Sequence, residues 1–189
     1  MSSHCIAPGC LEPRAAGAVF CEACMLAPAG KRGGWISAYK RRQRAGGDVP
    51  IDAHNIVRRL WIGSRPPVDR PLPMFDVVVL CAKEYQPEMP HVPVVLRVPL
   101  DDAQLDAVQF RAALLGAREL AAYLQAGKTA LVTCWAGRNR SALVAGLALR
   151  LLAPRSSADR IIATIRARRH PSALSNVHFV SYLRMFGRR

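Results

Sequence analysis

Acidic residues and long apolar runs are scarce in this sequence of 189 residues. It has 13 Asp and Glu against 27 Lys and Arg, which gives a formal net charge of +14. No apolar run reaches the roughly 20 residues that a membrane-spanning helix needs, and Arg150 interrupts the longest one. The first ten residues lack the basic and apolar stretches of a signal peptide. We therefore expect no membrane insertion, a cytoplasmic location and reduced thiols.

The positive charge is spread along the chain instead of forming a basic tail. Residues 1–50 carry 7 Lys and Arg against 3 Asp and Glu, and residues 51–189 carry 20 against 10. A field of this sign favours phosphate-bearing ligands and polyanions. Nucleic acid is therefore one candidate partner, although the charge could equally serve solubility alone.

Four of the six cysteines crowd into the first 24 residues, as two close pairs. Four thiolates in two pairs suit tetrahedral Zn²⁺, and a segment this short would need the metal to fold. We therefore predict a structural zinc module, with His4 as a spare ligand and disulfides as the alternative. The predicted zinc ligands are Cys5, Cys10, Cys21 and Cys24.

The chain divides into two predicted domains. A short basic helix follows the cysteine cluster, and Gly46, Gly47 and Pro50 end it. We place the boundary near residues 46–52, with a zinc-binding module over 1–47 and a catalytic domain over 52–189. Whether the first domain would contact protein or nucleic acid stays open.

Strand and helix patterns alternate in the second domain. Apolar β-branched runs predict strands, and apolar residues at helical spacing predict helices. This alternation predicts an α/β fold with a mostly parallel central sheet and helices on both faces. Strands are expected over residues 55–63, 75–82, 93–100 and 129–134, and helices over 106–127, 140–152, 156–169 and 174–186.

The stretch LVTCWAGRNRSALVAG joins the last predicted strand to a helix. It places Cys134 at the carboxyl end of the strand, where open α/β sheets bind ligands. The next residues would turn their backbone N–H groups toward an anion, at the positive end of the helix. Such a place also favours a thiolate. The predicted phosphate-binding residues are Trp135, Ala136, Gly137, Arg138, Asn139 and Arg140.

Two residues of this loop have particular chemistry. Gly137 permits a backbone conformation that other residues resist. Arg140 carries a planar fork that grips two phosphate oxygens at once, which a lysine cannot do. The spacing thus joins a nucleophile and a phosphate clamp in one turn, as attack on a phosphoryl group requires.

The motif CWAGRNRS resembles the Cys-x5-Arg-Ser/Thr signature of protein tyrosine phosphatases, and the compact chain resembles the dual-specificity subgroup. The resemblance covers roughly residues 52–187, because LWIGS is similar to the opening strand and RARRHPSALSNVHFVSYL to the closing helices. It implies that Cys134 is the nucleophile, that Arg140 binds the phosphate and that Ser141 assists departure of the cysteine sulfur. It implies no metal for catalysis. Thr133 departs from the pattern, which usually has His before the cysteine.

Phosphate-ester cleavage also needs a proton donor for the leaving oxygen. The stretch RVPLDDAQLD offers three aspartates. Asp102 lies 32 positions before Cys134 and fits the resemblance best, since relatives carry the acid in the second acidic position. Asp101 is the alternative, and Asp106 is expected to cap the next helix. The loop KEYQPEMPH is expected to form one wall of the site.

Three functions remain open at this stage. The first is a phosphatase that acts through a phosphocysteine on phosphoprotein, with phosphotyrosine favoured over phosphoserine or phosphothreonine. The second is a nucleic-acid-binding protein that acts on RNA 5′ phosphates, and the third is a non-catalytic phosphate-binding module. Cys81 ends the strand expected beside that of Cys134. Some relatives carry a redox-active cysteine at this place, which implies a possible disulfide partner; a buried apolar role is the alternative.

Overall fold

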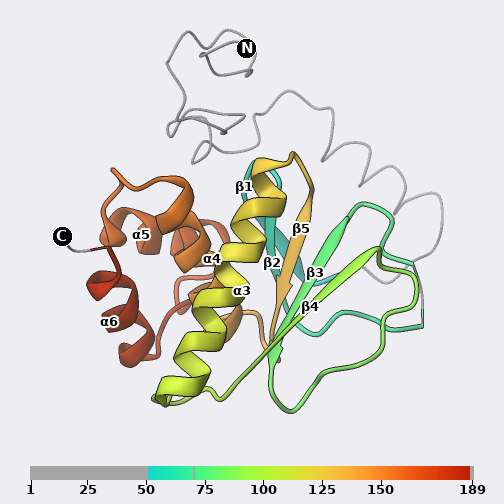
Figure 1. Cartoon of the computed structure of the whole chain (residues 1–189), viewed down its shortest axis with the longest axis horizontal. Helices are drawn as coiled ribbons and strands as arrows, with labels where there is room; N and C mark the ends of the chain where they lie inside the picture. Colours follow the sequence, from blue (N-terminus) through green and yellow to red (C-terminus); the bar gives the residue numbers. More distant parts are fainter. Residues whose placement is uncertain (1–50, 70, 188–189) are drawn as a thin grey trace, which may run out of the picture.

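A five-stranded sheet forms the centre of the computed structural model, which describes residues 51–69 and 71–187. The strand order is β1-β2-β5-β3-β4 (Figure 1). The strands are β1 (Ala53–Val57), β2 (Leu60–Gly63), β3 (Val77–Ala82), β4 (Val94–Leu100) and β5 (Ala130–Thr133). The predicted zinc module, with Cys5, Cys10, Cys21 and Cys24, and the basic helix after it lie outside the described residues.

The sheet is mixed, so the predicted mostly parallel sheet needs correction at one edge. Strands β2, β5, β3 and β4 run parallel, but β1 pairs antiparallel with β2. The sequence stretch expected as one strand over 55–63 is in fact part of a hairpin. The side chain of Asn55 donates to the carbonyls of Val57 and Arg58 at 3.0 and 3.2 Å and stabilises the turn. A turn this short can join only antiparallel strands.

The four predicted helices are present in the described residues. They are α3 (Ala107–Gln125), α4 (Arg140–Leu152), α5 (Ala158–Arg168) and α6 (Val177–Met185). Asp106 caps α3, as predicted, by accepting from the backbone N–H of Gln109 at 2.8 Å. Ser157 caps α5 in the same way, and Asn176 caps α6.

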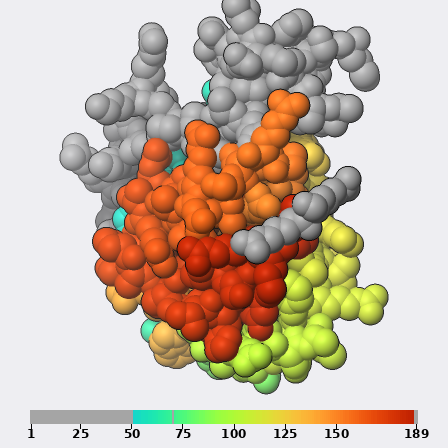
Figure 2. Space-filling model, turned by 90° about the vertical axis from the view of Figure 1, so that its left-hand side faces the viewer, coloured from blue at the N-terminus to red at the C-terminus, as the bar shows by residue number. Residues whose placement is uncertain are grey.

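Within the described residues, helices cover one face of the sheet only. Helices α3 and α4 pack there against β3 and β5, and α5 and α6 pack beside α4 (Figure 1). Figure 2 shows the side of the molecule that α5 and α6 cover. The opposite face, which includes Trp61, Val78 and Leu131, is covered by apolar loop residues such as Phe75 and Met89. The predicted helices on both faces are therefore not found in this part of the chain.

The parallel strands end together at one edge of the sheet. In the strand pairing, Gly63 of β2 and Leu80 of β3 both lie opposite Thr133 of β5. The loops that follow these strands therefore meet at the carboxyl edge, where α/β sheets bind ligands. None of the helices in the described residues is long and apolar enough to cross a membrane.

Candidate active site

The loop from Cys134 to Asn139, named the phosphate loop below for its predicted ligand, lies between β5 and α4, as the sequence predicts. Helix α4 begins at Arg140, directly after this loop, so the positive end of its dipole faces the loop. Most of the helix is buried, which fixes its position. Gly137 has a φ of +65°, and a Cβ there would lie 2.5 Å from the carbonyl of Gly63. Only glycine fits this position, because a side chain would be strained and would also collide.

The backbone amides of residues 135–139 donate no hydrogen bond in the described part of the chain. Trp135, Ala136 and Arg138 are exposed, so the loop lies at the surface of the molecule. Together with the amino-terminal end of α4, these amides form a concentration of free N–H donors beside Cys134. Such a nest is suited to an oxyanion.

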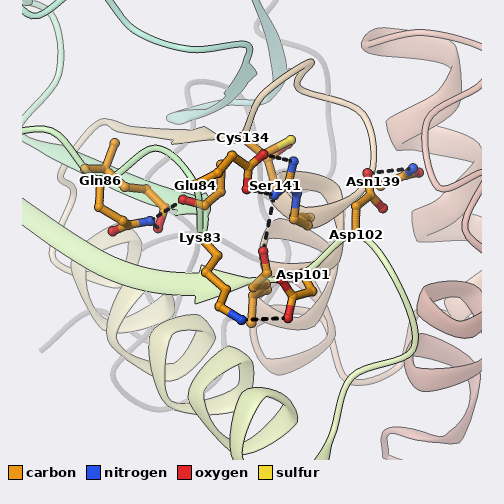
Figure 3. A network of polar contacts seen from close by, with 12 residues as sticks. Lys83, Glu84, Gln86, Asp101, Asp102, Cys134, Asn139 and Ser141 are labelled. Atoms are coloured by element: carbon orange, nitrogen blue, oxygen red, sulfur yellow. Dashed lines mark hydrogen bonds and ion pairs between the residues drawn. The ribbon is translucent and has the colours of Figure 1, made fainter.

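The thiol of Cys134 is buried, with 3% of the residue exposed. Its Sγ lies 3.2 Å from the hydroxyl oxygen of Ser141, in the first turn of α4. Figure 3 shows this pair between Glu84 on one side and Asn139 with Asp102 on the other. The structure therefore brings together the sulfur and the hydroxyl that the sequence assigns to one site.

Arg140 is held by a carboxylate of the loop expected to form one wall of the site, a residue that the sequence analysis does not single out. Its Nη1 and Nη2 donate to the two carboxylate oxygens of Glu84 at 2.5 and 2.7 Å, and Nη1 also donates to the carbonyl of Leu100 at 3.2 Å. An arginine has five N–H donors. The remaining two are on Nε and Nη2, and the Nε atom is buried without a partner. These two donors form one open edge of the guanidinium.

The Arg140–Glu84 pair keeps both groups charged. The hydrogen bond from Arg140 holds the pKa of Glu84 below its usual value, against the opposing effect of burial. Burial alone would lower the pKa of Arg140, but the hydrogen bond to Glu84 and the nearby acidic groups raise it overall. The guanidinium is thus a fixed cation within the site.

Asp102 lies at the rim of the loop. Its two carboxylate oxygens face the side-chain amides of Asn139 and Asn176 at 3.3 and 3.4 Å. Asn139 is itself held by Ser175, whose hydroxyl donates to the Asn139 amide oxygen at 3.2 Å. The structure therefore places Asp102 directly beside the phosphate loop.

Asp101 has different neighbours. Its carboxylate accepts from Gln109 at 2.7 Å and from Lys83 at 3.0 Å. The Gln109 hydrogen bond, followed by that of Lys83, lowers the pKa of Asp101. Asp101 is thus tied to Lys83 and Gln109, whereas Asp102 lies beside the loop.

Thr133, just before Cys134, contacts the neighbouring strand. Its hydroxyl donates to the carbonyl of Val79 in the neighbouring strand at 3.1 Å and is buried. It therefore fixes the end of β5 to β3, just before Cys134.

The rim beside Cys134 is aromatic. The indole of Trp135 is 47% exposed, and the Tyr85 ring approaches it edge-on with ring centroids 6.4 Å apart. The Arg65 guanidinium lies 3.9 Å from the centre of the indole ring. Tyr85 belongs to the loop expected to form a wall of the site, and it contributes to this rim.

Cys81 is fully buried and free. Burial, and next the nearby Cys134, raise the pKa of the Cys81 thiol. The strand register puts Leu80 opposite Thr133, so the next residues of the two strands are the two cysteines.

A groove of about 770 Å³ between α5 and α6 is separate from this site. Each charged side chain that lines it has a partner: Arg184 pairs with Asp159, and Arg166 donates to the carbonyls of Ala173 and Leu174. Residues 51–69 and 71–187 contain no group of three or more His, Cys, Asp or Glu placed to hold a metal ion. The phosphate loop is thus the best candidate for chemistry.

Three contributors to the site could not be selected from residue spacing alone. Glu84 is one charged residue of an exposed loop, and no spacing relates it to Arg140. Arg169, which lies behind the loop, is one of three arginines among residues 166–169. Asn176 is recognisable only through the family resemblance.

No family model and no curated protein matches the sequence. Solved structures do match. Human DUSP28 is 24% identical, with a TM-score of 0.61, and the match covers 71% of this chain and 92% of that one. A mouse putative dual specificity phosphatase complexed with zinc tungstate is 24% identical, with a TM-score of 0.59 and coverage of 71% and 86%. A mutant form of Tk-PTP is 25% identical, with a TM-score of 0.61 and coverage of 72% and 94%. The described part of the chain therefore has the fold of dual-specificity and tyrosine phosphatases.

Proposed function

We propose that this protein is a phosphatase that hydrolyses phosphate monoesters through a phosphocysteine. The main observation is the open edge of Arg140, which lies with five unpartnered amides around the buried thiol of Cys134. Preorganised donors of this kind stabilise the charge that develops on a transferred phosphoryl group. The fold supports the same conclusion by analogy.

In the first step, Cys134 Sγ attacks phosphorus and the bond to the ester oxygen breaks. The loop amides and the open edge of Arg140 hold the phosphoryl oxygens, while Glu84 fixes the guanidinium from the other side. Asp102 gives its proton to the leaving oxygen, as a general acid on a separate loop. The product of this step is a covalent phosphocysteine.

In the second step, Asp102 takes a proton from water, and the water oxygen attacks phosphorus. The phosphorus–sulfur bond breaks and inorganic phosphate leaves. The Ser141 hydroxyl, 3.2 Å from Sγ, donates to the departing thiolate. The cycle restores Cys134 as a thiolate and Asp102 as an acid.

Phosphotyrosine in a protein is the substrate that the rim favours. Trp135 and Tyr85 offer aromatic surface next to the nucleophile, where the ring of a phosphotyrosine would lie. Arg65 and the exposed Arg138 add positive charge for acidic residues of the substrate. Phosphoserine and phosphothreonine are the next candidates.

Two other functions are alternatives of lower rank. Action on RNA 5′ phosphates has only the net charge of +14 in its favour. A non-catalytic phosphate-binding module would need no acid, yet Asp102 lies at the loop.

One panel of substrates separates these functions. Wild-type protein should release phosphate from an aryl phosphate and from phosphotyrosine peptides, faster than from phosphoserine peptides or 5′-phosphorylated RNA. Cys134→Ser should lose all release, and Cys81→Ala is the matched control that keeps it. Binding of tungstate without any release would favour the non-catalytic module, and fastest release from RNA would favour the nucleic-acid function.

The N-terminal cysteines are proposed to bind one structural Zn²⁺. Four thiolates from Cys5, Cys10, Cys21 and Cys24 would supply a complete tetrahedral set. Purified protein should contain about one Zn²⁺ per chain and lose it in Cys21→Ser, while Cys81→Ala should keep it. A metal-free protein with disulfides among these four cysteines would contradict this assignment.

Cys81 is proposed to protect the oxidised nucleophile. Peroxide would convert the Cys134 thiolate to a sulfenic acid, and the Cys81 thiol would displace water to form a disulfide. Neighbouring strands lie about 4.8 Å apart, which is within the roughly 4.4–6.8 Å that a disulfide requires between Cα atoms. After peroxide and then a reductant, wild type should regain activity and Cys81→Ser markedly less. Equal recovery of activity in both proteins, with no Cys81–Cys134 disulfide in mass spectra, would mean that Cys81 is only a buried apolar residue.

A further inference from the structure

A second buried arginine lies behind the phosphate loop. Arg169 follows α5, and only 4% of its side chain is exposed. It is not among the residues that the proposed chemistry uses. A buried guanidinium is costly unless its donors are paired, so its contacts indicate what it does.

All five N–H donors of Arg169 have acceptors. Nε donates to the carbonyl of Gly137 at 2.9 Å, and Nη2 donates to that of Ala136 at 3.2 Å. The carboxylate of Asp52 accepts from both terminal nitrogens at 2.6 and 2.7 Å. His54 Nδ1, 2.7 Å from Nη1, must accept because arginine only donates.

The two loop carbonyls determine where two amides point. In a planar trans peptide, the C=O and the N–H point in opposite directions. The Ala136 carbonyl shares its peptide with the Gly137 N–H, and the Gly137 carbonyl shares its peptide with the Arg138 N–H. Since Arg169 binds both carbonyls from behind, both N–H groups point away from it, toward the free face of the loop.

A third carbonyl is held from the same side. The backbone N–H of Leu174 donates to the carbonyl of Arg138 at 3.0 Å, which directs the Asn139 N–H in the same way. The segment 169–174 thus holds three successive peptides of the loop. The missing Cβ of Gly137 makes this approach possible, because a Cβ would lie 2.5 Å from Arg169 Nη2.

We propose that Arg169, held by Asp52 and His54 of the first strand region, is a positioning residue that orients the loop amides for an oxyanion. It acts through the backbone and does not touch the substrate. This inference rests on the proposed phosphate site and adds a residue that determines its affinity. Loss of Arg169 should leave the peptides free to rotate, so that fewer amides face the anion.

The test measures oxyanion binding and needs no turnover. Tungstate or inorganic phosphate is titrated while iodoacetate alkylates Cys134, and protection of the thiol gives the dissociation constant. Arg169→Met and Arg169→Lys should each weaken binding about 10- to 100-fold, since two charge-assisted hydrogen bonds are lost. Arg168→Met, on the neighbouring and partly exposed arginine, should stay within twofold of wild type.

Urea unfolding and two Asp52 variants distinguish a loss of oxyanion binding from a loss of folding. Urea unfolding of each variant identifies proteins that are folded at the assay temperature. If Arg169→Met does not fold, Arg169→Lys and Asp52→Asn decide, and Asp52→Glu should recover part of the affinity lost in Asp52→Asn. Folded variants that lose stability but bind tungstate as wild type does would overturn the positioning role. Absence of tungstate binding in wild type would instead overturn the proposed function.

Discussion

The front and the back of the phosphate loop each carry a buried arginine, and the two differ in their free donors. Arg169 at the back gives all five N–H groups to the protein, whereas Arg140 at the front gives three. Both are paired with a carboxylate, Asp52 at the back and Glu84 at the front. Burial and pairing are therefore alike, and only the satisfaction of the donors distinguishes them.

Under the proposed function, this difference separates a structural cation from one that binds the phosphate. A fully satisfied guanidinium has no capacity left for a ligand, so Arg169 can act only on the loop. The unpartnered Nε of Arg140 is a buried donor that needs an acceptor from outside the protein. The two carboxylates also differ in role. Asp52 connects Arg169, and through it the loop, to the start of β1, whereas Glu84 fixes the orientation of the Arg140 guanidinium.

The largest effect should come from Arg140→Lys, which removes the two-donor edge of the guanidinium and keeps the positive charge. A lysine cannot present the two-donor edge, so kcat/KM for an aryl phosphate should fall by about 10³-fold. Steady-state kinetics measures this, with Arg168→Lys as the control that keeps wild-type values. A fall of less than threefold would mean that the open edge of Arg140 does not serve the reaction.

Asp102→Ala tests the acid that stands at the front of the loop. We expect kcat to fall about 10²-fold, most strongly for esters with poor leaving groups, because these need the proton. The rate should also lose its decline on the alkaline side, where the acid is deprotonated. Asp101→Ala, whose carboxylate is held by Lys83 and Gln109, is the matched comparison. If it alone shows these changes, the acid is Asp101.

Glu84→Gln keeps Arg140 and weakens the hydrogen bonds that orient its guanidinium. The amide accepts a weaker hydrogen bond than the carboxylate, so we expect KM to rise about tenfold with a smaller change in kcat. Initial-rate measurements over a range of substrate concentrations separate the two constants. Glu88→Gln is the control in the same segment, since Glu88 pairs with Arg97. Unchanged KM in Glu84→Gln would show that the pair is dispensable.

Asp52→Asn should give the smallest effect, a change in the free energy of unfolding, and it tests the Asp52–Arg169 pair behind the loop. The hydrogen bond from Arg169, followed by its charge, lowers the pKa of Asp52 despite partial burial. A lowered folded-state pKa stabilises the fold above the ordinary value, about 4, and this stabilisation disappears as pH falls through the lowered value. Asp52→Asn should therefore cost about 1 kcal/mol at pH 6, since the carboxylate is half-exposed and screened.

The control is the difference in unfolding free energy between wild type and Asp52→Asn, measured again at low pH. Urea unfolding of wild type and Asp52→Asn should give free energies that converge as the pH falls, because Asp52 is protonated first in the unfolded chain and then, through its lowered pKa, in the folded protein. A difference that does not change between pH 6 and pH 2 would contradict an ionic role for Asp52.

The sequence predicts the front of the loop better than the back. Strand, nucleophile, turn, glycine and arginine are consecutive between Leu131 and Ser141, so local spacing is enough to define them. The boundaries of α4 are predicted to the residue for the same reason. The alternation of strands and helices likewise predicts the α/β fold.

The back of the loop depends on contacts between distant segments. Arg169 meets Asp52 across 117 positions, and Glu84 meets Arg140 across 56. No local pattern specifies which of several arginines or glutamates makes such a contact. The antiparallel β1, and the sheet face that carries loops instead of helices in the described residues, are not predicted, because a two-residue turn and apolar loops leave little periodic signal.

Trapping the covalent intermediate tests the central claim most directly. Asp102→Ala should slow the second step, so mixing it with an aryl phosphate and quenching in acid should leave phosphate on the enzyme. Peptide mass spectrometry should then place one phosphate on Cys134, and none should be found in Cys134→Ser. Continued hydrolysis by wild type with no phosphate on Cys134, or with phosphate on another residue, would contradict the phosphocysteine mechanism.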